Sequence, residues 1–421
     1  MKEEEITQCA DLLQQFHGQF APIFYDRRQA DTSAKVLHGL LLNGVRANAA
    51  KTARAVPGVN VDSVQHFMGR SPWDHRPIIG QLHHLTAHHI GHPEAILAVD
   101  DSGFAKKGNK SVGVKRQYSG TLGKVDNCQI GVYAAYLSPL GRCLVDEELY
   151  LPTEWCEDKQ RREEAQIPKH VQFQTKPELA LRQIERAHEG PLPFQWVACD
   201  DLYGQNGAFR DGVDDLGLRY VAEVPCSTKV WTEHPPLKGP GPSGGGRPRE
   251  QWSLRADAPD PQTVEDVAAS LTDWQLVRCR RGTKKPIRSE WAARRVYPWR
   301  DGMPGRQRWL LIQRPPDDEN KYYLSNVGPE VSIEKLAQVA SKEWFVEQCF
   351  RDEKTEIGLD EYEVRKWHGW HHHMTMCMLA LAFLTFVQQS WEKRGRTEHP
   401  KGPSRAEPCF RTGATEPHRS V

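Results

Sequence analysis

Two pairs of adjacent aspartates, Asp100-Asp101 and Asp200-Asp201, each follow directly on a short apolar run. A later segment supplies a third acidic position at Glu347. Carboxylates that converge without a counter-ion repel one another, so such a cluster is suited to binding divalent cations. Two Mg²⁺ ions about 3.5–4 Å apart can activate a water or a 3′-hydroxyl and stabilise the leaving oxygen of a phosphodiester. We therefore expect one carboxylate of each pair, with Glu347, to form a magnesium site in which Mn²⁺ can substitute.

Lys354 is the candidate basic residue of this site. It lies seven residues after Glu347, about two turns of an α-helix, so both side chains are expected on one helix face. A lysine in that position could bind a DNA phosphate beside the metal ions. On spacing alone, a solvated charged face is the more common explanation for such a pair.

The acids can converge only if the apolar runs before them are strands of one sheet. Residues 95–99 and 194–199 are typical of strands that are buried on both faces. Further strands are predicted over 112–118, 128–137, 142–150 and 220–224, with a helix over 176–189. This order predicts an α/β fold, a mixed sheet with flanking helices, whose carboxylates lie at the sheet edge. The alternative is that each aspartate pair simply begins a solvated turn.

The regions around this core are predicted to differ in character. Residues 1–90 are mostly helical by apolar periodicity and carry basic residues, which predicts a DNA-binding helical domain or a cap with solvated charges. Residues 235–249 are rich in Pro and Gly, which predicts a linker into a β-rich insertion that ends at 334. The catalytic core is expected to cover 91–234 and 335–390, with helices over 341–354 and 369–389. Residues 391–421 are expected to be a disordered tail.

The insertion contains a strongly basic stretch between positions 278 and 300, where the only acid is Glu290. Its nine bases are Arg278, Arg280, Arg281, Lys284, Lys285, Arg288, Arg294, Arg295 and Arg300. Trp291, Tyr297 and Trp299 are interleaved with them, a pattern typical of nucleic-acid-binding surfaces. A solvated hairpin face is the alternative.

The composition argues against several other classes of protein. The formal net charge is +1 over 421 residues, and the ten cysteines include no CxxC pair, which predicts reduced thiols rather than disulfides or a cysteine zinc site. The N-terminus lacks the apolar segment of a secretory signal. The longest apolar segment, 374–387, is shorter than a membrane span and predicts a core helix. We therefore expect a cytoplasmic protein with no membrane partner.

Taken as a set, the motifs resemble those of DDE transposases of bacterial insertion sequences, in particular the family numbered 701 in the superfamily with a YREK box. The matching text is Val99-Asp100-Asp101-Ser102-Gly103-Phe104, Lys106-Lys107-Gly108, Arg116-Gln117-Tyr118-Ser119-Gly120, Asp126-Asn127-Cys128-Gln129, Leu149-Tyr150-Leu151-Pro152, Asp200-Asp201-Leu202-Tyr203-Gly204, Glu347-Gln348-Cys349-Phe350 and Tyr362-Glu363-Val364-Arg365. The resemblance implies an RNase H-like core with a β-rich insertion before the glutamate.

The resemblance also implies a catalytic triad of Asp100, Asp200 and Glu347, all three of them metal ligands, with Lys354 as the lysine of the YREK box. The implied enzyme is a DDE-type transposase that hydrolyses and transesterifies DNA phosphodiesters with two Mg²⁺ ions. Its partners would be the element ends and target DNA, on which it would act as a homodimer. The expected location is the bacterial cytoplasm, in association with the nucleoid.

Several alternatives remain open within this resemblance. Asp101 could replace Asp100, although Asp100 places Ser102 where the family has a hydroxyl residue two positions on. The tyrosine and arginine of the YREK box fall on Ala340 and Glu343, so an impaired remnant that only binds DNA is one rival, and an RNase H-like nuclease without strand transfer is another.

The wider superfamily reacts through a DNA hairpin, in which an aromatic side chain of the insertion holds an extruded base. Base extrusion costs a few kcal/mol, which aromatic stacking can offset. Trp291 and Trp299 are both candidates for this role.

Overall fold

The apolar run before Asp100 forms β1 (Ile96–Ala105), a central strand of a mixed sheet in the computed structural model. The structure describes residues 3–42, 48–243, 246–249, 251–281, 286–316, 318–342 and 344–398. The side chains from Ile96 to Val99 are fully buried, as expected for a strand with helices on both faces. The predicted α/β fold with a mixed sheet and flanking helices is therefore confirmed.

The strands around β1 are arranged as in an RNase H-like core. β1 is antiparallel to β3 (Lys124–Ser138), which also pairs with β2 (Lys115–Ser119) and β4 (Gly141–Leu149). On its other side β1 is parallel to β5 (Trp196–Cys199), and β5 is parallel to β6 (Arg219–Val224). The carboxyl end of β5 at Cys199 therefore lies beside Val99, whereas β1 continues to Ala105, so Asp100 and Asp101 lie within their strand and not at its end as predicted.

Helices cover both faces of these strands. α8 (Lys176–Glu189) begins at a capping box between Thr175 and Glu178 and packs on β3, where the Gln183 side-chain amide donates to the Val132 carbonyl. The connections between the strands also contain α6 (Thr153–Glu157), α7 (Lys159–Glu164), α9 (Asp201–Gly204) and α10 (Gly207–Asp215). α13 (Trp344–Asp352) packs on β1, β3 and β4.

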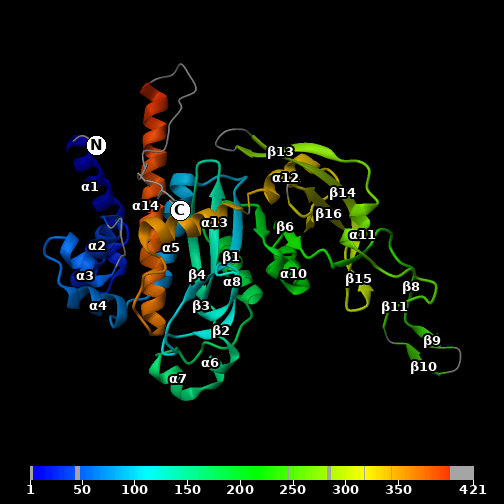
Figure 1. Cartoon of the computed structure of the whole chain (residues 1–421), viewed down its shortest axis with the longest axis horizontal. Coiled ribbons are helices and arrows are strands. Elements are labelled where there is room, and N and C mark those ends of the chain that lie inside the picture. Colours follow the sequence, from blue (N-terminus) through cyan, green and yellow to red (C-terminus); the bar gives the residue numbers. More distant parts are fainter. Residues whose placement is uncertain are drawn as a thin grey trace, which may run out of the picture.

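The long helix α14 (Trp367–Glu398) packs on β4 of the sheet and on several of the N-terminal helices (Figure 1). Those helices are α1 (Glu3–Gly18), η1 (Ala21–Ile23), α2 (Arg27–Leu42), α3 (Ala49–Ala55), α4 (Val61–Gly69) and α5 (His75–Ile90). Residues 374–380 of α14 are buried all round, which confirms the predicted core helix. Among the described residues, α14 is the one helix long and apolar enough to cross a membrane, and 67% of that stretch is buried inside the protein.

The β-rich insertion continues the core sheet. β17 (Lys321–Ser325) is antiparallel to β6, which joins both parts into a sheet of 13 strands. The other strands of this part are β7 (Lys229–Trp231), β12 (Gln262–Thr263), β13 (Gln275–Arg281), β14 (Pro286–Arg300), β15 (Met303–Pro304) and β16 (Arg308–Arg314). Helices α11 (Val264–Ala269) and α12 (Ile333–Ala340) accompany them.

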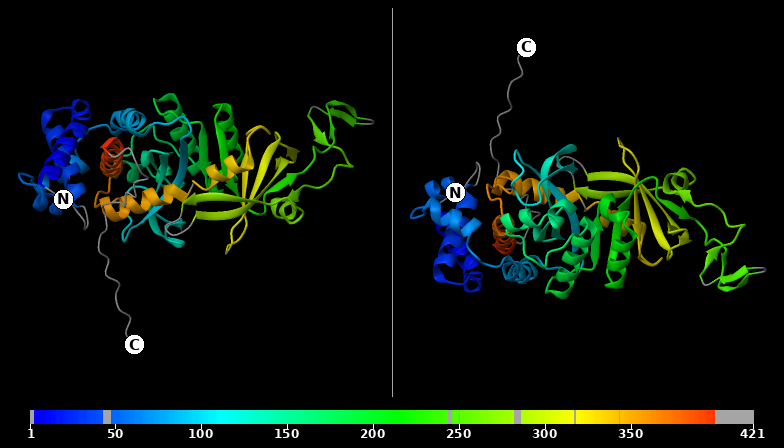
Figure 2. Two further views of the ribbon diagram at one scale, coloured as in Figure 1. Left: turned by 90° about the horizontal axis from the view of Figure 1, so that it is seen from above. Right: turned by 90° about the horizontal axis from the view of Figure 1, so that it is seen from below.

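The insertion ends in two small ribbons, at the end of the molecule opposite the N-terminal helices (Figure 2). One pairs β8 (Leu237–Lys238) with β11 (Ser253–Leu254), and the other pairs β9 (Gly241–Ser243) with β10 (Gly246–Arg249). β8, β9 and β10 lie within 235–249, the stretch rich in Pro and Gly that was predicted to be a linker, and β11 follows just after it.

The late helices differ from the prediction in three respects. The helix expected over 341–354 begins at Trp344, α geometry ends at Asp352, and η2 (Glu353–Ile357) is a π-helical turn that stops at Gly358, whose φ is 86°. Glu347 therefore lies on α13 and Lys354 in the π turn, so no regular α-helix connects the two residues. α14 extends beyond 389 to Glu398, while residues 399–421 of the predicted tail, like Glu343, lie outside the described residues.

Candidate active site

Asp100 and Asp101 are consecutive on β1, so their side chains point to opposite faces of the sheet. In the register with β3, Asp100 lies opposite Tyr133 and Asp101 opposite Val132, and opposite residues share a face. Tyr133 packs on Phe350 of α13 with a ring-centroid distance of 5.3 Å. Asp100 is therefore on the face that α13 covers.

Lys354 reaches this same face. Its Nζ donates a hydrogen bond of 2.7 Å to Oγ of Ser102, which lies two residues beyond Asp100 on β1. Burial lowers the pKa of Lys354, and the negative charges of Asp360 and Asp100 act in the opposite direction. The structure thus brings the lysine of the predicted site to Ser102 and Asp100.

Asp101 has an ion-pair partner on the opposite face. Nζ of Lys176, the first residue of α8, lies 2.7 Å from Oδ2 of Asp101. The two side chains are only 16% and 10% exposed. Separating a pair with so little exposure would leave a poorly solvated charge, so the ion pair with Lys176 gives Asp101 a structural role.

Asp200 lies at the same edge of the sheet. β5 ends at Cys199, which pairs with Val99 in parallel register, so Asp200 follows beside the position of Asp100. Asp200 is the N-cap of α9, and its Oδ1 accepts hydrogen bonds from the Leu202 amide at 3.1 Å and the Tyr203 amide at 3.4 Å. The cap holds this carboxylate at the carboxyl end of β5.

The electrostatic environment of Asp200 disfavours a negative charge. Burial raises the pKa of Asp200 to about 7, and the charge of Asp101 adds to this effect. The hydrogen bond from the Tyr203 amide opposes the rise without cancelling it. A nearby cation would stabilise the negatively charged form of a carboxylate in this position.

The Tyr203 side chain lies near the carboxylates of Asp100, Asp101 and Asp200. It is fully buried, and its hydroxyl has no hydrogen-bond partner among the described residues. Burial raises the pKa of Tyr203 well above its ordinary value, and the charges of Asp101, Asp100 and Asp200 raise it further. The three aspartates are therefore close enough to act on one phenol.

Sequence reasoning missed two residues of this site. Tyr203 was part of the Asp-Asp-Leu-Tyr-Gly match but received no role, although its position three residues after a helix cap was a usable signal. Lys176 carried no local signal, because its partner Asp101 lies 75 residues away in the chain.

Glu347 is on α13, which packs on β1, but its side chain is exposed, whereas Val346, Cys349 and Phe350 face the core. Its carboxylate is therefore not part of the buried cluster around Tyr203. The structure brings Asp100, Asp200 and Lys354 into one region and places Glu347 on the helix above it, with its carboxylate toward solvent.

The basic stretch of the insertion lies on β13 and β14. Arg278 and Arg288 are directly opposite each other in the register of these strands, and both are exposed. Like charges in opposite positions destabilise a sheet, so this arrangement suits a polyanionic partner. Arg294 is also exposed, while Arg295 donates a 3.0 Å hydrogen bond to the Val327 carbonyl and is half-buried.

The remaining basic residues of this stretch are paired or are not described, so they add nothing to the exposed basic surface formed by Arg278, Arg288 and Arg294. Arg300 is engaged in an ion pair with Asp211. Lys284 and Lys285 lie outside the described residues, and the side chains of Arg280 and Arg281 are not described.

The two tryptophans of the stretch have different environments. Trp291 is fully buried and packs on Tyr323 with a ring-centroid distance of 5.9 Å. Trp299 is 44% exposed, near the end of β14. Burial excludes Trp291 as a side chain that stacks on an extruded base and leaves Trp299 as the candidate.

Comparison with known proteins agrees with this geometry. The model of a family described as "DDE superfamily endonuclease" matches residues 12–286, which include Asp100 and Asp200 and end before Glu347. A protein of Microchaete diplosiphon named "Probable transposase for insertion sequence element IS701" is 30% identical over 209 residues, 49% of this chain and 51% of the relative. The match thus spans about half the length of that relative. Because the family model covers more than half of the chain, this protein belongs to the DDE superfamily endonucleases.

Proposed function

We propose that this protein is a transposase that cleaves DNA at the ends of an insertion sequence and joins the freed strands to target DNA. The observation that carries the proposal is the convergence of Asp100 and Asp200 at one sheet edge, around the buried Tyr203 hydroxyl. The similarity to a relative named as an IS701 transposase supports an insertion sequence as the substrate.

The reaction is proposed to depend on divalent metal. Asp100, Asp200 and Glu347 would supply the oxygen ligands that Mg²⁺ prefers. The residues fit such an ion because Asp200 is buried beside Asp101 and its pKa is raised to about 7, which is the environment a cation would relieve. Two bound ions would activate the attacking oxygen and stabilise the leaving oxygen. Glu347 would have to turn from solvent toward the aspartates.

The basic side chains are proposed to position the DNA. Lys354, held at Ser102 by a 2.7 Å hydrogen bond, would bind a phosphate next to Asp100. Asp101 would not bind metal, since its pairing with Lys176 anchors the end of β1 to α8. In this proposal, Asp100 on one face of β1 takes part in DNA cleavage, and Asp101 on the other face stabilises the fold.

The remaining surfaces are proposed to recognise the substrate. Arg278, Arg288 and Arg294 would contact DNA phosphates, and Trp299 would stack on an extruded base of a hairpin intermediate. The N-terminal helical region, residues 1–90, is proposed to bind DNA as well. The core would comprise 91–234 and 335–390, and the active form would be a homodimer associated with the nucleoid.

A supercoiled plasmid that carries the element ends tests the proposal. With Mg²⁺ we expect nicking at the ends followed by joined products, and neither product with EDTA or with Asp200→Asn. Nicking without joining would indicate an RNase H-like nuclease, and specific binding without nicking would indicate an impaired remnant. Either result would contradict the proposed strand transfer.

A further inference from the structure

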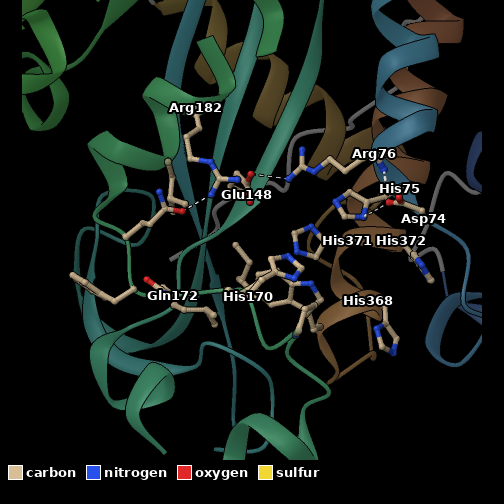
Figure 3. A pocket seen from close by; sticks show the side chains of 18 of the residues that line it. Asp74, His75, Arg76, Glu148, His170, Gln172, Arg182, His368, His371 and His372 are labelled. Atoms are coloured by element: carbon tan, nitrogen blue, oxygen red, sulfur yellow. Dashed lines mark hydrogen bonds and ion pairs between the residues drawn. The ribbon is translucent and has the colours of Figure 1, made fainter. Parts of the chain in front are cut away.

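A cavity lies away from Asp100 and Asp200, where α5, β4 and the start of α14 meet (Figure 3). It has a volume of about 600 Å³, and its walls include Pro168 and residues 170–174. Asp100, Asp200 and Glu347 are not among the described residues that line it. Five histidines line the cavity, namely His75, His170, His368, His371 and His372.

Two of these histidines and a buried glutamate form a compact group of metal-binding side chains. His75, Glu147 and His371 each offer one ligand atom within 4.8 Å of those of the other two. Nδ1 of His371 lies 2.8 Å from both oxygens of Glu147, and Nε2 of His75 lies 3.7 Å from Oε1. The imidazole rings of His75 and His371 are stacked face to face, with centroids 4.3 Å apart (Figure 3).

The hydrogen bonding of this group is incomplete. Nε2 of His75, the ring atom that faces Glu147, is buried and has no hydrogen-bond partner among the described residues. The side chains of His371 and Glu147 are 1% and 0% exposed, so water does not satisfy them from the surface. Buried polar atoms without partners are rare, and binding of an ion is one way in which such atoms are satisfied.

The neighbouring charges do not neutralise Glu147. Arg76 and Arg186 each form ion pairs with both Asp146 and Glu148, at distances between 2.7 and 3.0 Å. The two arginines thereby balance the two acids on either side of Glu147 along β4. Among the described residues, the direct partners of the Glu147 carboxylate are His75 and His371, while Arg76 and Arg186 act on it from a longer distance. A bound cation would place positive charge at the carboxylate itself.

We propose that His75, Glu147 and His371 form a Zn²⁺ site that is separate from the magnesium site. Two imidazoles and one carboxylate are a known zinc donor set, and three protein ligands leave the fourth position for a water or another ligand from the cavity. Tetrahedral bonds of about 2.0–2.1 Å place ligand atoms roughly 3.3 Å apart. The observed separations of 2.8 and 3.7 Å lie on either side of that value, so small side-chain movements suffice.

The zinc ion would join three segments that are distant in sequence. His75 begins α5, Glu147 lies on β4, and His371 is in the second turn of α14. A bond from each to one ion would hold the N-terminal helices against the core sheet. The site does not depend on the proposed transposase activity, because it shares no residue with it.

Zinc titration of the full-length chain tests the proposal. The protein is stripped with a chelator and titrated with Zn²⁺ against a chromophoric competitor, in an Asp200→Asn background that weakens the magnesium site. We expect one tightly bound zinc per chain and a zinc-dependent rise in Tm. Co²⁺ in place of Zn²⁺ should give the visible absorption of a tetrahedral complex.

Matched variants decide the location of the ion. His75→Ala and Glu147→Gln should weaken zinc binding by at least about 100-fold, because even loss of an outer-shell partner costs 10–100-fold. His170→Ala removes an exposed histidine of the same cavity and should bind like the parent. The proposal is wrong if the parent binds no stoichiometric zinc, or if His75→Ala and Glu147→Gln bind as tightly as His170→Ala. His75 is partly exposed, so its variant remains informative if a His371 variant does not fold.

Discussion

Substitution of Asp100 and Asp101, one at a time, separates their roles. Asp101→Asn removes the counter-charge of Lys176, whose side chain is 16% exposed. Loss of one partner of a buried ion pair costs about 3–5 kcal/mol, and the residual exposure of both groups places this case near the lower limit. Folding free energies of about 5–15 kcal/mol leave the variant folded but less stable. Asp100→Asn leaves the Asp101–Lys176 ion pair in place and should therefore lower the free energy of unfolding less than Asp101→Asn does.

The effect on DNA cleavage should be the reverse. Loss of a metal ligand removes several kcal/mol of transition-state stabilisation, so Asp100→Asn should reduce the single-turnover nicking rate by at least about 1000-fold. Folded Asp101→Asn should retain the parent rate within about threefold. The free energy of unfolding is measured by urea titration, and nicking is measured on the same preparations with enzyme in excess.

A second substitution controls for the buried lysine charge. Asp101→Asn combined with Lys176→Met removes both charges and should be more stable than the sum of the single effects by about 2 kcal/mol. If folded Asp101→Asn is inactive while Asp100→Asn still nicks DNA, the assignment of the two faces of β1 is wrong.

Three further predictions concern DNA contacts. Lys354→Met should slow single-turnover nicking about 10–100-fold, because it removes a charged hydrogen bond to the DNA phosphate. Stability measured by urea titration should not fall, because burial disfavours the charge of Lys354. An unchanged nicking rate would contradict the role of Lys354 in phosphate binding. Arg278→Gln with Arg288→Gln should weaken DNA binding to all sequences and lower the slope of log K against log salt by about two units, as measured by fluorescence anisotropy. Trp299→Ala should weaken binding of a hairpin end by about 1–3 kcal/mol, with Trp299→Phe close to the parent, whereas Trp291→Ala should instead lower stability by about 3–5 kcal/mol. Equal hairpin affinity in Trp299→Ala and the parent would exclude stacking at that residue.

Local sequence signals predicted the elements that carry the acids. The apolar runs before Asp100 and Asp200 were sufficient for β1 and β5, because a strand buried on both faces needs only a short unbroken apolar stretch. The predicted helix over 176–189 matches α8 at both ends, since its capping box and its C-terminal Gly190 are local features. The late helix was mispredicted because the π turn at Glu353–Ile357 leaves no periodic signal in the sequence.

The tryptophans show the limit of pattern-based reasoning. Trp291 and Trp299 are eight residues apart on β14, so alternation assigns them to the same face of the strand. Trp291 is covered because it packs on Tyr323 of β17, whereas Trp299 lies beyond that neighbour, opposite Pro304 in a short hairpin. Their difference in burial depends on how far other strands extend.

The sequence by itself determined the α/β class, the two apolar runs that form strands just before the aspartates and the basic stretch of the insertion, because each depends on residues that are neighbours in the chain. Only the tertiary structure decided that Asp100 faces α13 and Asp101 faces Lys176, since alternation separates the two side chains without saying which helix covers each face. It also decided the grouping of His75, Glu147 and His371, which come from three segments with no spacing rule between them. Such groups arise from the packing of distant elements, and a linear pattern carries no information about that packing.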